Sequence, residues 1–199
     1  MPRIFRRLVL AGAMTVTATG CSLPEGDPTT PTGAHYRWLA AVASGDGEAL
    51  WALLDPSIRD DYERWRVAER AAVARIRSDY PKAEVEPALA AFDGGWRGDL
   101  PEAQRLFEAT RRAEGPPTLE GLSTLGARVR SESLSEDGRT ATLSTWGGDE
   151  VSAVKGDDGR WHLRLSRLEV ERLRTAREAA ERNLARVMEN LRQLAGKGG

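Results

Sequence analysis

The apolar pattern of this chain changes its period once, and that change limits the fold more than any other feature. Up to Gly115, apolar side chains recur every three or four positions, which is typical of helices that bury one face. From residue 127 they alternate with polar ones, which is typical of strands with one buried face. The sequence therefore predicts an α+β fold, with N-terminal helices packed on a later sheet.

Four helical segments are expected before the sheet. Asp46 is placed to cap the second, and Pro56 suits the first turn of the third, which ends at Pro81. The fourth begins near Asp99 and ends at Gly115. The apolar stripes of the four are His35, Trp38, Leu39 and Val42; Leu50, Leu53 and Leu54; Ile58, Tyr62, Trp65, Ala72, Ile76 and Tyr80; and Leu106 and Phe107.

Four short alternating segments follow, ARVRSESL, TATLSTW, VSAVK and RWHLRL, and hairpin-turn compositions separate them. A four-stranded antiparallel meander is therefore expected. One face should pack on the helices, because Ala141 and Leu143 share a face, as do Trp161 and Leu163. His162 alternates with the last two and is expected at the surface.

Residues 167–199 are expected to form a long amphipathic helix with a flexible end. Ser166 and Glu169 have the spacing of a capping box. Apolar residues then recur at spacings of three and four, as in a coiled-coil seam, which Arg177 and Ala180 interrupt. The stripe either binds a partner helix through residues 167–195 or packs on its own domain, and the sequence leaves both open. The candidate helix-interaction face is Leu184, Val187, Leu191 and Leu194.

The first 20 residues have the layout of a signal peptide. Arg3, Arg6 and Arg7 precede an uncharged apolar run at residues 8–18. That run is about half of the roughly 20 residues that a membrane-spanning helix needs. We therefore expect an export signal and not a permanent span.

The four residues Ala18, Thr19, Gly20 and Cys21 resemble the lipobox of bacterial lipoproteins, with Ala18 where leucine is usual. The resemblance implies that Cys21 becomes a lipidated N-terminus, and two or more acyl chains such as palmitate anchor a protein stably. The alternative is ordinary cleavage near Gly20, which leaves Cys21 as a free thiol. Ser22 is not the acidic residue that retains some lipoproteins, so a host with two membranes should hold the chain in its outer membrane, facing the periplasm.

Residues 21–33 are expected to be the lipidated cysteine and a flexible tether, because SLPEGDPTTPTG is rich in proline and glycine. Its twelve residues can span up to about 40 Å. One domain over residues 34–166 should follow. Without Arg3, Arg6 and Arg7, the chain's 29 basic residues become 26 against 30 acidic ones, a net charge of −4. This balance argues against nucleic acid as a partner.

The helical pair in YRWLAAVASGDGEALWALL and the closing hairpin in DGRWHLRL resemble small bacterial lipoproteins with a nuclear-transport-factor-like domain. The resemblance covers residues 34–166 and implies helices closed against a curved sheet as a cone. That cone is a catalytic pocket in some members and a binding surface in many. This chain departs from the pattern in two ways: no strand pair is evident between Tyr62 and Gly115, and a long helix follows the last strand.

Residues that could carry chemistry are few. His35 and His162 are far apart and no cysteine follows Cys21, so neither a metal nor another cofactor is expected. His35, at a helix start, is a candidate pocket residue. Trp96 in the loop FDGGWRGD is a candidate for a pocket mouth or partner surface, whereas most of the other tryptophans should be core.

The segment at residues 147–151, GGDEV, resembles the signature of diguanylate cyclases. Those enzymes need cytoplasmic GTP and further metal- and nucleotide-binding residues, for which an exported chain supplies no matching set. Two glycines beside acidic residues also suit a plain hairpin turn. We therefore interpret the segment as a turn.

The sequence as a whole predicts an envelope-anchored lipoprotein that acts as a binding or assembly module and is not an enzyme. Its partners would be the membrane, through lipid on Cys21, and an envelope protein or a second copy. Two alternatives are a cone-pocket domain that binds a small molecule or acts as an enzyme, and a structural spacer that oligomerises through its last helix.

Overall fold

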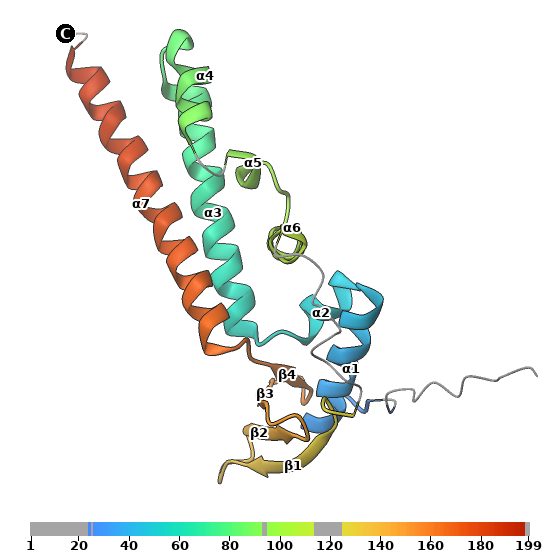
Figure 1. Ribbon diagram of the computed structural model, residues 1–199. Helices are drawn as coiled ribbons and strands as arrows, with labels where there is room; N and C mark the ends of the chain where they lie inside the picture. Colours follow the sequence, from blue (N-terminus) through green and yellow to red (C-terminus); the bar gives the residue numbers. More distant parts are fainter. Residues whose placement is uncertain (1–23, 25, 93–94, 114–124, 198–199) are drawn as a thin grey trace, which may run out of the picture.

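The computed structural model describes residues 24, 26–92, 95–113 and 125–197, so Cys21 and the predicted signal peptide lie outside the described part. A small sheet forms one end of the molecule, and a helical arm projects from it (Figure 1). The α+β fold predicted from the sequence is confirmed. Among the described residues, we find no helix with the length and apolar character needed to cross a membrane.

The first three helices are α1 (Pro31–Ser44), α2 (Gly47–Leu53) and α3 (Pro56–Asp79). A side-chain oxygen of Thr30, Asp46 or Asp55 caps each one by accepting a hydrogen bond from a backbone N–H in the first turn. α1 begins three residues before the expected domain start at 34. Ahead of it, the Pro28 carbonyl accepts a hydrogen bond of 3.0 Å from the Trp161 backbone N–H. Part of the expected tether is therefore fixed to the sheet.

Three shorter helices follow, α4 (Lys82–Ala91), α5 (Gly95–Gly98) and α6 (Ala103–Ala113). α6 was expected, but α4 was not, because the sequence interpretation ended the third helix at Pro81 and began the next one near Asp99. Pro87 lies inside α4, although proline usually interrupts a helix. α4 folds back beside the far end of α3, at the tip of the arm (Figure 1).

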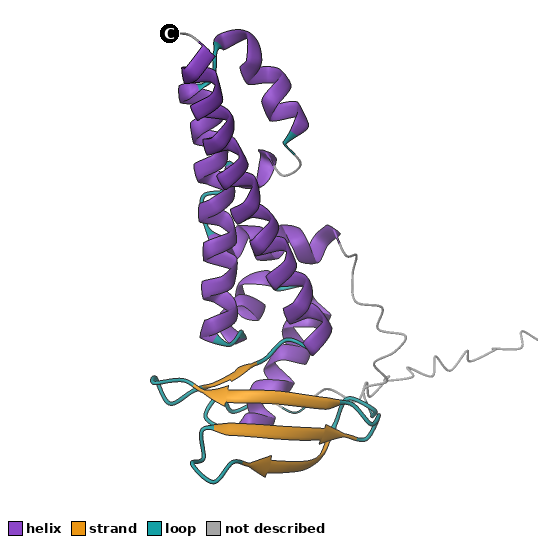
Figure 2. Ribbon diagram, turned by 90° about the vertical axis from the view of Figure 1, so that its left-hand side faces the viewer, coloured by secondary structure: helices purple, strands orange, loops and turns teal. Residues whose placement is uncertain are grey.

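The sheet consists of β1 (Val129–Leu134), β2 (Thr140–Thr145), β3 (Glu150–Lys155) and β4 (Trp161–Leu163). Each strand pairs antiparallel with the next, which confirms the predicted meander (Figure 2). Its inner face packs on α1 through the buried residues Ala34, Ala141, Ala153, Trp161 and Leu163.

Directly after the sheet, α7 (Arg167–Lys197) begins at the predicted capping box. The Ser166 backbone N–H and hydroxyl donate to a carboxylate oxygen of Glu169 at 2.9 and 2.6 Å, and the Glu169 N–H donates back to the Ser166 hydroxyl at 3.3 Å. α7 runs along α3 in the same direction, away from the sheet (Figure 1). At 1.5 Å per residue, its 31 residues make an arm about 46 Å long.

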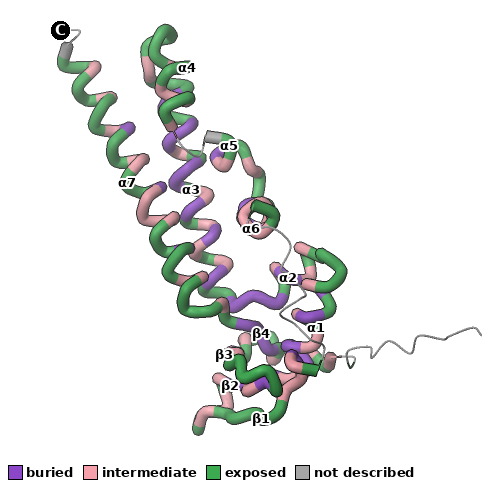
Figure 3. Tube along the Cα trace, in the orientation of Figure 1, coloured by how far each residue is buried: buried purple, intermediate pink, exposed green. Residues whose placement is uncertain are grey.

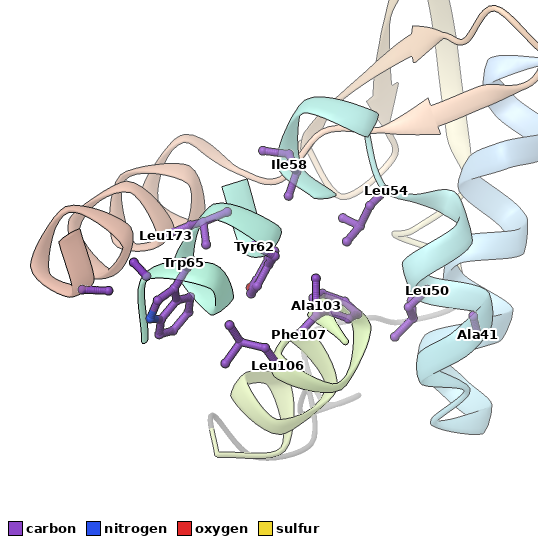
Figure 4. Close-up of a cluster of buried hydrophobic side chains, with 12 residues drawn as sticks. Ala41, Leu50, Leu54, Ile58, Tyr62, Trp65, Ala103, Leu106, Phe107 and Leu173 are labelled. Carbon is purple, nitrogen blue, oxygen red and sulfur yellow. The ribbon is translucent and has the colours of Figure 1, made fainter. Parts of the chain in front are cut away.

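The main core lies at the base of the arm, where α2, α3, α6 and α7 meet (Figure 4). Four aromatic rings fill its centre. Tyr62 packs edge-on against Phe107 with ring centroids 5.5 Å apart, and the rings of Trp51 and Trp65 each lie about 6 Å from that of Tyr62. This packing fixes the first half of α3 and of α7 to the rest of the domain.

Two side-chain expectations are wrong. His162 is buried, with 6% of its surface exposed. The β3–β4 turn covers its face of the sheet, since a Cβ on Gly156 would lie 2.8 Å from the His162 ring. Trp146 is 67% exposed, because it follows the last residue of β2 and lies in the turn beyond it. Trp65 and Trp161 are buried and Trp38 and Trp51 half-buried, as expected for core residues.

Candidate functional site

The predicted seam of α7 lies against α3 of the same chain. Its buried residues, Leu173, Ala180 and Val187, recur every seven positions, as in a parallel helix pair. Leu184 and Leu191 pack beside Val187 and are partly buried. The structure thus shows the apolar stripe of α7 packed on its own domain, which is one of the two alternatives that the sequence left open. Leu194 is half-buried near the tip and belongs to none of the buried clusters.

Burial becomes sparse toward the tip of the arm (Figure 3). The tip cluster has three buried members, Ala72, Ile76 and Val187, whereas the main core at the base has twelve. No residue of α4 is buried. Around these three buried residues the tip has seven partly buried apolar side chains: Tyr80, Val85, Ala88, Leu89, Phe92, Leu184 and Leu191.

A groove of about 400 Å³ runs between α4 and α7 at this tip. Its volume is within the range of roughly 300 to 1,000 Å³ that is usual for binding sites. Ile76 of α3 and Tyr80, the residue directly after α3, line the groove. Ala88, Ala91 and Phe92 form one wall, and Asn183, Arg186, Val187 and Asn190 form the other.

Arg186 is the charged residue that lines the tip groove, and Glu84 of α4 lies outside its lining. Glu84 precedes Ala88 by four residues, which places both on one face of α4, and Arg186 lines the α7 wall. Both charged residues are exposed, and neither lies in an ion pair with another described residue. The neighbouring charges are paired locally, Arg75 with Asp79 at 2.9 Å and Arg192 with Glu189 at 3.1 Å. Lys82 and Glu86 of α4 are exposed as well, so charged side chains of both signs surround the groove.

Trp96 lies elsewhere, in α5 on the side of α3, and does not line the tip groove. It is 52% exposed, and the Arg97 guanidinium lies 5.1 Å from its ring centroid and 5.5 Å from that of Trp65. Arg97 is also 3.7 Å from the buried carboxylate of Glu69, to which the Trp65 indole N–H donates at 3.1 Å. Trp96 is a surface residue, but its side chain belongs to a contact that holds α5 on α3.

His35 is buried at the start of α1, with 4% of its surface exposed. Its Nε2 donates a hydrogen bond of 2.9 Å to the Ala127 carbonyl, just before β1. Burial lowers the pKa of the imidazole, although the contact with Ala127 and the charge of Asp149 act in the other direction. His35 therefore joins α1 to the sheet, far in the chain from the tip groove.

A second hollow lies in the main core between α3, α6 and α7. Tyr62, Trp65 and Phe107 form its floor, and an ion pair of 2.9 Å between Arg111 and Glu169 lies at its edge. Its volume of about 170 Å³ is below the usual range for ligand sites. It suits a few water molecules better than a substrate or an organic cofactor.

The first three residues of the GGDEV segment, 147–149, lie in the β2–β3 turn, as interpreted from the sequence, and Glu150 and Val151 begin β3. The Thr145 N–H donates to the Asp149 carbonyl at 2.9 Å, and Gly148 adopts a positive φ of 90°, which favours glycine. No group of three or more histidine, cysteine, aspartate or glutamate residues in the described part of the chain is arranged to hold a metal ion.

The sequence interpretation missed the α4 wall of the groove. Val85, Ala88, Leu89 and Phe92 follow the i, i+3, i+4, i+7 spacing of one helix face, and this signal could have revealed α4. Comparison with known proteins gives no match among family models, curated proteins or solved structures. The resemblance to nuclear-transport-factor-like lipoproteins therefore stays a prediction.

Proposed function

We propose that this chain is an envelope-anchored lipoprotein that acts as a binding module without catalysis and presents the tip groove to a protein partner. The observation that carries the proposal is the incomplete apolar cluster at the tip, where three buried residues are surrounded by seven partly buried ones. Apolar surface of this kind is typical of protein interaction sites.

The position of the groove supports this role. The first described residues lie beside the sheet, and the tip is at the opposite end of an arm about 46 Å long (Figure 1). A lipid on Cys21 would therefore hold the sheet near the membrane and the groove away from it. The parallel pair of α3 and α7 gives the arm stiffness, because one helix supports the other along its length.

The form of the groove favours a protein partner over a small molecule. It is an open groove between two helices, and the polar residues in its α7 wall, Asn183, Arg186 and Asn190, could meet the side chains of a docked helix. Small-molecule sites usually enclose most of their ligand.

Photocross-linking in intact cells tests the proposal. We would place p-benzoylphenylalanine at Ala91, an exposed residue of the groove wall, and at the matched control Thr142, an exposed residue of the sheet. The proposal predicts a discrete cross-linked protein product from position 91 and none from position 142. The absence of a product from position 91, at equal expression, would contradict it.

A further inference from the structure

Two large apolar side chains are exposed at the end of the sheet where β2 turns into β3. Trp146 is 67% exposed and Leu125 is 64% exposed, and neither belongs to a buried cluster. Their segments are neighbours, because the Trp146 N–H donates to the Arg128 carbonyl at 2.9 Å and the Gly147 N–H donates to the Gly126 carbonyl at 2.7 Å. The turn thus presents an indole to the outside that contributes to no part of the core.

The same end of the sheet is where the N-terminal segment joins the domain. Gly26 lies against α1, since a Cβ on it would meet the Gly33 carbonyl oxygen. Two residues further along α1, the His35 ring contacts the Ala127 carbonyl at 2.9 Å (Figure 1). Ala127 directly follows the glycine that accepts the hydrogen bond from the β2–β3 turn. An unbroken series of contacts therefore joins Gly26 to the turn that carries Trp146.

The length of chain between Cys21 and the domain is short. Gly26 is five residues after Cys21, and five residues of extended chain span at most about 18 Å. A lipid on Cys21 therefore holds the start of α1, and with it the β2–β3 turn, close to the bilayer. The membrane is the one surface that the anchor itself brings to Trp146.

We propose that Trp146, with Leu125 on the adjoining segment, contacts the lipid surface and gives the domain a second attachment to the membrane. The inference rests on the proposed function, because it requires the lipid on Cys21. Tryptophan suits this place, since its amphipathic ring is favoured at the level of the lipid headgroups. The contact is intramolecular once the chain is anchored, so a weak interaction is sufficient.

The charges near Trp146 make zwitterionic lipid a sufficient partner. Arg128 and Arg130 lie at the start of β1, and Asp149 and Glu150 lie where the turn enters β3. These two cations and two anions sum to zero, so the turn has no net attraction to an anionic surface. The contact then depends on the indole.

The second attachment has a consequence for the tip groove. A domain held only by a flexible tether is free to turn at the membrane. Contact through both Cys21 and Trp146 restricts this rotation, so the arm keeps one direction relative to the bilayer. The groove is thereby presented to its partner at a constant position.

Tryptophan fluorescence in vesicles tests the inference. Full-length protein isolated from host membranes is reconstituted in phosphatidylcholine vesicles, with or without bromine on the acyl chains, because bromine quenches tryptophans that contact it. The wild type should emit less in brominated vesicles, and Trp146→Phe should remove most of this difference. Trp96→Phe is the matched control: Trp96 is 52% exposed but lies in α5 on the arm, so the difference should persist without it.

The outcomes separate the inference from the anchor on which it rests. Protein that floats with the vesicles, but shows no bromine quenching or the same quenching in Trp146→Phe as in the wild type, would overturn the inference and leave the anchor in place. Protein that does not float with the vesicles would overturn both. Trp146→Phe should melt at the wild-type temperature, because its side chain is outside the core. The cross-link from position 91 tests the groove independently.

Discussion

Arg177 of α7 lies 2.5 Å from the carboxylate of Asp61 on α3, and both side chains are partly buried, at 19% and 25% exposure. In the sequence, Arg177 looks like a defect in the apolar seam of α7. In the structure it occupies the seam position facing Asp61 and joins the two helices of the arm. A polar residue at such a position fixes the register of a helix pair.

A double-mutant cycle measures this ion pair. Asp61→Ala and Arg177→Ala should each lower the free energy of unfolding, and the double variant should lose less than the sum of the two. We expect a coupling energy of about 1 kcal/mol, which is at the upper end of the range that double-mutant cycles give for exposed ion pairs. Urea unfolding provides the measurement, and strictly additive losses would show that the pair contributes nothing.

The second prediction concerns Gly98, where α5 approaches α3 closely. A Cβ at this position would lie 2.8 Å from Cγ2 of Val73 and 3.1 Å from the Glu69 carbonyl oxygen. Gly98→Ala should therefore destabilise the fold by about 1 to 3 kcal/mol, as overpacking does. Gly196→Ala is the control, because nothing lies within 4 Å of its Cβ and alanine favours helix by up to about 1 kcal/mol. A neutral Gly98→Ala would mean that α5 is not held against α3.

The third prediction is a pH dependence that comes from His35. Its pKa is lower in the folded chain than the ordinary value of 6.5, mainly because of burial. The unfolded chain therefore binds more protons as the pH falls through about 6.5, and the free energy of unfolding should decrease there. The loss should stop once the pH is below the folded pKa.

His35→Gln tests that dependence, because glutamine can donate to the Ala127 carbonyl but does not titrate. Urea unfolding at pH values of about 7.5 and about 5.5, on either side of the ordinary histidine pKa, should show a smaller difference for this variant than for the wild type. If the free energy of unfolding changes equally between the two pH values in the variant and in the wild type, the pH dependence comes from groups other than His35.

The fourth prediction concerns the anchor, which lies outside the described residues. Cys21→Ala should abolish acyl-lipid labelling and release the protein from the membrane fraction, because the acyl chains are the proposed attachment. Persistent labelling would end the lipoprotein interpretation. In a host with two membranes, fractionation with inner-membrane markers would contradict the expected outer-membrane location.

Local signals in the sequence were sufficient for most elements. The capping box at Ser166, the cap at Asp46, Pro56 in the first turn of α3 and the three hairpin turns depend on neighbouring residues, and the structure has all of them. Helix α4 was missed because helical structure was taken to end at Pro81, and the helical spacing of Val85, Ala88 and Phe92 beyond it was not considered.

Other errors came from tertiary contacts that no local pattern contains. Alternation places His162 on the face opposite Trp161, but whether that face is exposed depends on how the β3–β4 turn folds over it. Trp96 was singled out correctly as exposed, yet its contact with Arg97 depends on the packing of α5 on α3. The groove itself could not be predicted, because it needs three helices whose relative positions only the fold provides.

Hydrogen exchange at the tip tests the central claim most directly. We would compare α4 and the last turns of α7 in native membranes with the same segments in the dilute, delipidated protein. If the tip groove is occupied in the envelope, exchange of the Lys82–Ala91 amides should be at least about tenfold slower in membranes, whereas β2 should exchange equally in both samples. Equal exchange of α4 in the two samples would contradict the account, because it would show that nothing covers the groove where the protein functions.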